Sequence, residues 1–149
     1  MTSKQTVCIL PVLGLIIIAI SCTDLHLNPA ASQIQTVIDS PSFKNDIMPV
    51  LKYTCGSSGA CHGGATPQLG LNLEVDSLAY AATVNVIAQR ENMARILPFK
   101  PDSSFLFLVL SDTASVRLNY YRMPLTRYSL PQETRLTIKN WILKGALNN

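Results

Sequence analysis

An uninterrupted apolar run from Val7 to Ile20 constrains this chain most, because it separates a leader from the part that can fold. Lys4 is the only charge before the run, which ends in the small residues Ser21-Cys22. This order is typical of a secretory signal peptide. A retained transmembrane anchor is the alternative, but the run is shorter than the roughly 20 apolar residues that a spanning helix needs.

The four residues that end this segment, Ala19-Ile20-Ser21-Cys22, resemble the lipobox of bacterial lipoproteins. The resemblance implies that Cys22 is lipidated and becomes the first residue of the mature chain. Two or more acyl chains anchor a protein stably without spanning the bilayer. We therefore interpret residues 1–22 as a lipoprotein signal peptide. We expect the protein in the cell envelope of a bacterium, attached to the membrane by lipid and facing the periplasm or the cell exterior.

If the protein is exported, the oxidising compartment outside the inner membrane restricts the roles of its four cysteines. Cys8 leaves with the signal peptide and Cys22 is assigned to the lipid, so the mature chain keeps the single pair Cys55 and Cys61. Unpaired thiols seldom persist in an oxidising compartment. The pair is therefore a disulfide, part of a metal site, or the attachment point of a covalent cofactor.

Charge and composition exclude several classes of function. The net charge is only +3 and the basic residues are spread along the chain, so no nucleic-acid partner is expected. The densest basic group, Arg117, Arg122 and Arg127, indicates a solvated face or the rim of a docking surface. No Ser-His-Asp, paired-carboxylate or phosphate-binding pattern is present, so we do not expect an enzyme.

The mature chain has the length of one domain. Residues 23–41 are polar and lack a sustained period, which is typical of a flexible linker, and residues 42–149 are assigned to the domain. Helical spacing and end signals predict an all-α domain of about four short helices joined by long irregular segments. The first two expected helices run from Asp46 as cap to Cys55 and from Asp76 or Ser77 as cap to Val84. The third is a buried helix from Phe105 to Leu110, for which a strand is the main alternative. The fourth runs from a Ser129/Gln132 capping box, with Pro131 in its first turn, to just before Gly145.

The segment from Cys55 to Gly64 is the chemical centre of the sequence. Its four glycines in ten residues rule out a regular element and allow close approach to a ligand. Haem c attachment uses the signature C-x-x-C-H. Here Cys61-His62-Gly63 keeps the second half, while five small residues separate Cys55 from Cys61 and must bulge outwards. A plain disulfide is the main alternative, and zinc binding through Cys55, Cys61 and His62 would lack a fourth ligand.

An ordered series of short segments covers residues 43–149 and resembles the small cytochrome c-like domains of bacterial lipoproteins, including those of planctomycetes and Bacteroidetes. These segments are Phe43, Asp46-Ile47-Met48-Pro49-Val50-Leu51, Cys61-His62-Gly63-Gly64, Gly70-Leu71-Asn72-Leu73, Ala79-Tyr80, Val84-Asn85-Val86, Pro101-Asp102-Ser103-Ser104-Phe105-Leu106, Arg122-Met123-Pro124, Leu130 and Trp141-Ile142-Leu143-Lys144-Gly145-Ala146.

The resemblance implies one covalent haem c bound by Cys55 and Cys61, with His62 as proximal and Met123 as distal iron ligand. The longer cysteine spacing leaves attachment through one thioether or through two as alternatives. The implied function is one-electron transfer to a redox partner protein, by a carrier and not a catalyst. The alternative is a haem-free, disulfide-closed lipoprotein that acts as a binding or scaffold module.

Cys22→Ala tests the lipid anchor. Without the cysteine there is no sulfur to acylate, so we expect the protein to be released from membranes or to remain as an unprocessed precursor. Membrane fractionation and the mass of the mature chain measure both outcomes. Unchanged membrane association together with unchanged processing would exclude lipid attachment at this site.

Overall fold

The computed structural model describes residues 37–57, 59, 61–89, 91–112, 114, 121–126 and 128–149, all within the compact unit Ile34–Asn149. The predicted signal peptide, Cys22 and most of the predicted linker lie outside these residues. None of the described helices combines the length and the apolar character that a membrane crossing requires.

The described residues form helices and no strand, which confirms the prediction of a helical domain. Two isolated β-bridges, Val84–Ile96 and Ile87–Ala94, tie the 84–96 segment together. In chain order the elements are the π-helical η1 (Phe43–Ile47), α1 (Met48–Val50), the π-helical η2 (Leu51–Gly56), the 3-10 turn η3 (Gln68–Gly70), α2 (Asp76–Thr83), the 3-10 turn η4 (Pro101–Ser103), α3 (Phe105–Val109) and α5 (Gln132–Leu143).

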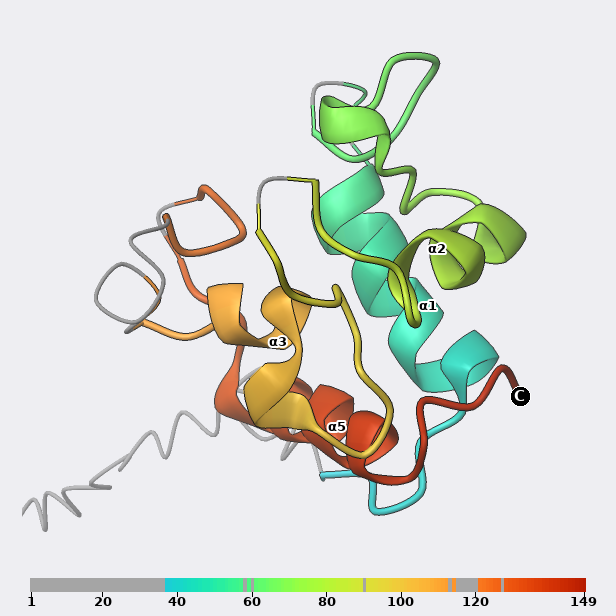
Figure 1. Ribbon diagram of the computed structural model, residues 1–149, viewed down its shortest axis with the longest axis vertical. Coiled ribbons are helices and arrows are strands. Elements are labelled where there is room, and N and C mark those ends of the chain that lie inside the picture. Colours follow the sequence, from blue (N-terminus) through green and yellow to red (C-terminus); the bar gives the residue numbers. More distant parts are fainter. Residues whose placement is uncertain are drawn as a thin grey trace, which may run out of the picture. The chain divides into compact units, whose positions relative to one another are not determined.

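The elements η1, α1 and η2 form one continuous helix (Figure 1). The predicted cap at Asp46 is wrong, because Ser42 is the N-cap and its side chain accepts a hydrogen bond from the backbone of Asn45. Asp46 lies inside η1 and its Oδ2 accepts the Ser42 N–H at 2.7 Å. The helix starts earlier than expected because Phe43, in its first turn, is buried against the core.

Proline shapes the middle of this helix. Pro49 has no N–H, so the regular pattern of hydrogen bonds four residues apart cannot continue through it. The Met48 N–H instead donates to the carbonyl of Phe43, five residues back. Such π-turns are one of the recognised ways in which a helix accommodates an interruption.

The predicted helix near residue 76 is confirmed, but its predicted cap at Asp76 or Ser77 is wrong. Val75 stands at the N-cap and makes no side-chain cap bond. The preceding turn is stabilised by Asn72, whose Oδ1 accepts the N–H groups of Glu74 and Val75 at 3.0 and 3.2 Å. Asp76 lies in the first turn, where its negative charge interacts favourably with the positive end of the helix dipole.

The apolar segment 105–110 forms the expected buried helix, α3, followed by Leu110. Leu108, Val109 and Leu110 are all buried. The hydroxyl of the fully buried Ser104 donates to the carbonyl of Lys100 at 2.9 Å and accepts the Leu97 N–H at 2.9 Å. These bonds fasten the start of α3 to the loop before it.

The last helix, α5, is the most accurately predicted element, apart from its start. Its expected inward residues Thr134, Ile138, Trp141 and Ile142 are all buried. Gly145 follows its end with φ +98, a conformation that suits glycine.

The predicted capping box at the start of α5 is wrong. The helix begins only at Gln132, and Pro131 stands before its first turn as the N-cap. A residue before proline is disfavoured in helical conformation, so Leu130 and Ser129 are kept out of the helix.

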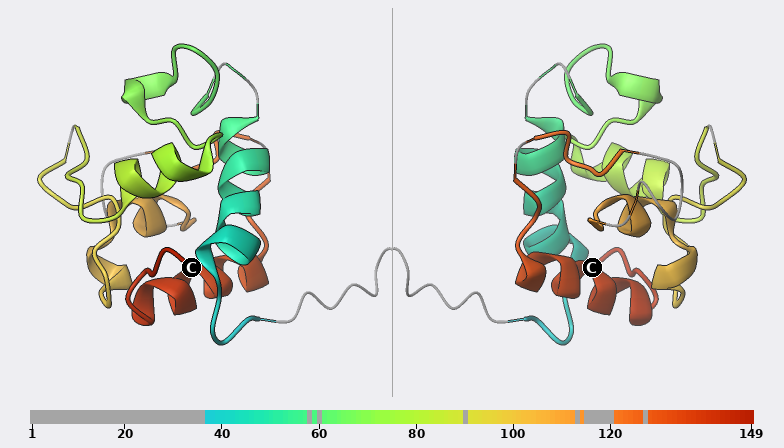
Figure 2. Two further views of the ribbon diagram at one scale, coloured as in Figure 1. Left: turned by 90° about the vertical axis from the view of Figure 1, so that its right-hand side faces the viewer. Right: turned by 90° about the vertical axis from the view of Figure 1, so that its left-hand side faces the viewer.

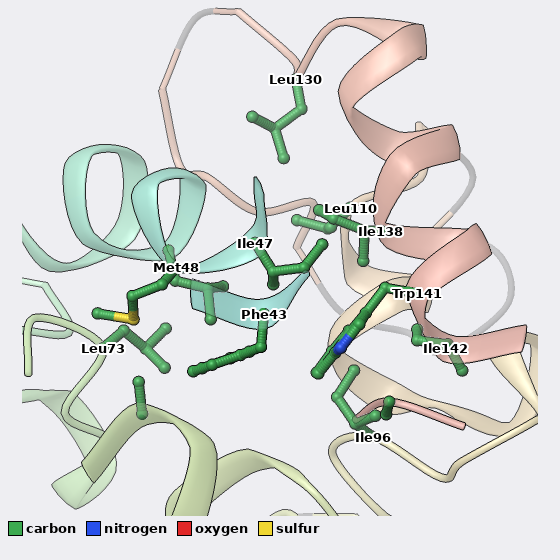
Figure 3. Close-up of a cluster of buried hydrophobic side chains, with 13 residues drawn as sticks. Phe43, Ile47, Met48, Leu73, Ile96, Leu110, Leu130, Ile138, Trp141 and Ile142 are labelled. Atoms are coloured by element: carbon green, nitrogen blue, oxygen red, sulfur yellow. The ribbon is translucent and has the colours of Figure 1, made fainter. Parts of the chain in front are cut away.

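The core joins the first helix to the last (Figure 3). The ring of Phe43 lies 5.1 Å from that of Tyr80 and 5.5 Å from that of Trp141, measured between centroids. Trp141 Nε1 donates to the carbonyl of Leu147, and the Tyr80 hydroxyl donates to that of Ala146, both at 2.9 Å. The chain after α5 is therefore fixed against both aromatic residues.

Ile138→Ala tests this core. Ile138 is 1% exposed, so its truncation should lower the free energy of unfolding by about 2–5 kcal/mol through lost burial and a cavity. Leu143→Ala is the matched control on the same helix. Leu143 is 45% exposed, so this substitution should lower the free energy of unfolding by only about 0.5 kcal/mol. Urea denaturation of the full chain measures both, and equal losses would contradict the described packing.

Candidate functional site

The loop that contains Cys61 and His62 is closed by backbone hydrogen bonds. Cys55 lies in η2, and its carbonyl accepts the His62 N–H at 3.0 Å. The carbonyl of His62 in turn accepts the Leu73 N–H at 2.7 Å, and that of Cys61 accepts the Gln68 N–H at 2.8 Å. The backbone at Cys55 and at His62 is therefore joined directly across the five-residue spacer.

Two glycines make this closure possible. A Cβ atom on Gly63 would lie 1.8 Å from the carbonyl oxygen of Gly56, and a Cβ atom on Gly56 would lie 2.9 Å from the backbone of Leu73 and Glu74. Real Cβ atoms do not approach backbone atoms so closely. Both positions therefore require glycine, and the close approach that they allow is between backbone segments; the predicted approach to a ligand stays a prediction.

The two cysteine sulfurs are free thiols with different surroundings. Cys55 is partly buried and packs against the core cluster, whereas Cys61 is exposed. Burial raises the pKa of Cys55 to about 11, and the negative charge of an ionised Cys61 adds to the increase. The two sulfurs thus lie near enough to interact, and Cys61 is the more accessible.

His62 is half buried and incompletely bonded. Its Nδ1 is buried and has no hydrogen-bond partner in the part of the chain that the structure describes. Burial lowers the pKa of His62, backbone hydrogen bonding to Gln68 and Leu71 opposes this decrease, and the positive charge of Arg95 adds to it. Its neutral form, which is favoured here, is the form that binds metals.

Sequence reasoning missed Arg95, whose charge acts on His62. Arg95 Nη1 donates to the carbonyl of Ala82 at 2.7 Å, and its backbone N–H donates to Val86 at 2.7 Å. Burial lowers the pKa of Arg95. No local motif surrounds this arginine, and only the folding of the 84–96 segment brings its charge towards His62.

Met123 lies on a separate segment, after α3. Its side chain is partly buried against the core cluster, its N–H donates to the carbonyl of Val109 at 2.7 Å, and its peptide bond to Pro124 is cis. Figures 1 and 2 place the 121–126 segment, in orange, at the level of the C-terminal end of the helix that carries Cys55. The structure thus joins Cys55, near the end of the helix, to His62 in the following loop through one backbone hydrogen bond, and it fixes Met123 independently.

Two surface clefts lie elsewhere. One of about 250 Å³ is lined by residues of α3 and α5, including Phe107, Arg135 and Lys139, and one of about 240 Å³ by residues including Pro41 and Trp141. Neither is lined by a predicted site residue. Within the described ranges no three His, Cys, Asp or Glu side chains converge as they would around a metal ion.

Comparison with known proteins adds no relative: no family model, no curated protein and no solved structure matches this chain. The assignment of the site therefore depends on its own residues.

Gly63→Ala tests the closure of the loop. The added Cβ would collide with the Gly56 carbonyl, so the backbone must shift, and we expect a loss of about 3 kcal/mol in the free energy of unfolding. The control is Gly59→Asn, because nothing lies within 4 Å of a Cβ there and asparagine tolerates its positive φ at a cost of about 1 kcal/mol. Urea denaturation compares the two, and a harmless Gly63→Ala would contradict the described contact.

Proposed function

We propose that this chain is a lipid-anchored c-type cytochrome with one covalent haem, which carries single electrons to and from a redox partner protein. One observation carries the proposal: the free thiol of Cys61 and the half-buried His62, whose Nδ1 has no partner among the described residues, lie in a loop that a backbone hydrogen bond closes onto Cys55, the second free thiol. A buried polar atom without a partner is costly, and a missing ligand is one established reason for it.

The donor set fits haem c. Cys55 and Cys61 would supply the thioether sulfurs, His62 a ring nitrogen and Met123 a thioether sulfur. When bound, the haem supplies an iron centre that accepts and returns one electron. His62 and Met123 are a common ligand pair of such centres, and the thioether raises the reduction potential.

The chain's own residues have distinct tasks in this proposal. Exposed Cys61 is the sulfur that attachment reaches first, while partly buried Cys55 orients the loop against the core. The bond from the His62 N–H to the Cys55 carbonyl fixes the histidine relative to that cysteine. Met123 is fastened to the carbonyl of Val109, so its position does not depend on the loop.

We also propose that the helical domain is cytochrome c-like. Support comes from the sequence resemblance over residues 43–149 and from the packing of η1 against α5, where Phe43 contacts Trp141. The segments that carry the resemblance include both helices and the loop between Cys55 and Gly64.

Mass spectrometry of the full chain, matured in a host with haem c machinery, tests the proposal. We expect the added mass of one haem and a Soret band that survives acid-acetone extraction. Cys61→Ala should lose covalent haem, whereas Cys55→Ala retains some if one thioether suffices. A colourless wild-type protein with a Cys55–Cys61 disulfide would contradict the proposal and favour the haem-free alternative.

Met123→His tests the distal ligand. A nitrogen ligand stabilises the reduced iron less than a thioether, so the variant should keep its haem and show a lower reduction potential, within the roughly 0.8 V range that axial ligands span. Spectroelectrochemistry measures the potential, and the weak long-wavelength band of a ferric iron–sulfur bond should disappear. Met48→Leu is the control, because Met48 is buried in the core. Survival of the band in Met123→His would assign the ligand elsewhere.

A further inference from the structure

The two residues Leu73 and Glu74 lie against both ends of the cysteine loop. At its far end, the Leu73 N–H donates to the carbonyl of His62 at 2.7 Å. Next to this bond, Oε2 of Glu74 accepts the Gly64 N–H at 2.8 Å. At the near end, a Cβ atom on Gly56 would lie 2.9 Å from the Glu74 nitrogen. One short segment therefore contacts the loop where it begins and where it closes.

The bond from Gly64 to Glu74 differs in kind from the others that close the loop. Among the residues that the structure describes, Glu74 provides the only side chain that binds the backbone of residues 61–64. The remaining bonds join one backbone group to another. A hydrogen bond to an ionised carboxylate is roughly twice as strong as one between neutral groups. The identity of the side chain at position 74 therefore matters to the closed loop.

Glu74 acts from a fixed support. Oδ1 of Asn72 accepts the Glu74 N–H at 3.0 Å. The preceding residue, Leu73, is 2% exposed and belongs to the hydrophobic core. The backbone that carries the carboxylate is thus held in place by groups outside the loop.

A ligand to a metal is held in its working position by groups behind it, which are themselves held by packing and hydrogen bonds. We propose that Glu74 is such a positioning residue: through the Gly64 N–H it keeps the loop closed and His62 in place beside Cys55. The inference rests on the proposed function, in which His62 binds the iron. Glu74 acts only through the backbone of the loop.

Amide hydrogen exchange, followed by NMR on the full chain purified reduced and without haem, provides the test. Glu74→Met removes both carboxylate oxygens and keeps a side chain of similar length. If the carboxylate closes the loop, the amides of Gly64 and His62 should both exchange roughly 10-fold faster, because the loop opens more often. The amides of α5 should keep their wild-type rates.

Two further variants separate the hydrogen bond from charge and shape. Glu74→Gln keeps an acceptor oxygen at the same place, so it should restore both exchange rates to within about threefold of wild type. It also decides the case if Glu74→Met does not fold, since any acceleration should then be confined to Gly64 and His62. Glu133→Met removes a half-buried carboxylate from the first turn of α5 and should leave both rates unchanged.

Acceleration at Gly64 alone, or at neither amide, would overturn the inference, because Glu74 would then not act on His62. Equal acceleration throughout α5 would also overturn it, since Glu74 would then support the whole domain. Wild type that carries no covalent haem after maturation would contradict the proposed function. The exchange rates, measured without haem, would still show whether Glu74 keeps His62 in place.

Discussion

The contacts of the Phe43 ring determine how the rest of the domain is arranged. One ring meets Tyr80 of α2 and Trp141 of α5, so three helical elements far apart in sequence share a single side chain. Aromatic pairs in such geometries add to the free energy of plain burial. Because Phe43 begins the helix that ends near Cys55, this contact also ties the start of that helix to the core.

The path from Phe43 to Cys55 is not a regular helix, and Pro49 lies at its centre. Its missing N–H interrupts the hydrogen-bond pattern, and the turns on either side of α1, η1 and η2, are π-helical. Cys55, near the end of this helix, packs against the core, while Cys61, six positions later in the following loop, is exposed. The chemical difference between the two sulfurs follows from these different surroundings.

The sequence correctly predicted those structural features that depend on the local spacing of apolar residues. The inward face of α5 and the burial of Leu108 to Leu110 follow from apolar spacing. The backbone contacts that require glycine at positions 56 and 63 were not predicted, because they depend on which segments the fold brings together. Helix starts were predicted poorly, because a hydrogen-bonding side chain such as Asp46 can serve several positions near a helix end. Which one it serves depends on burial of its neighbours, here Phe43, and that is decided by the whole fold.

The candidate site also contains residues that a local motif reveals and residues that only the fold brings into play. Cys55, Cys61 and His62 stand in one short string, so their motif is visible in the sequence, and the fold only closes it. Arg95 has no such signal, because its effect on His62 comes from its burial and from the fold of the segment that carries it. A folded chain ordinarily pairs its buried donors, and exceptions are expected where function overrides stability. Among the described residues, the Nδ1 of His62 is such an exception, and it lies in the motif that the sequence already made visible.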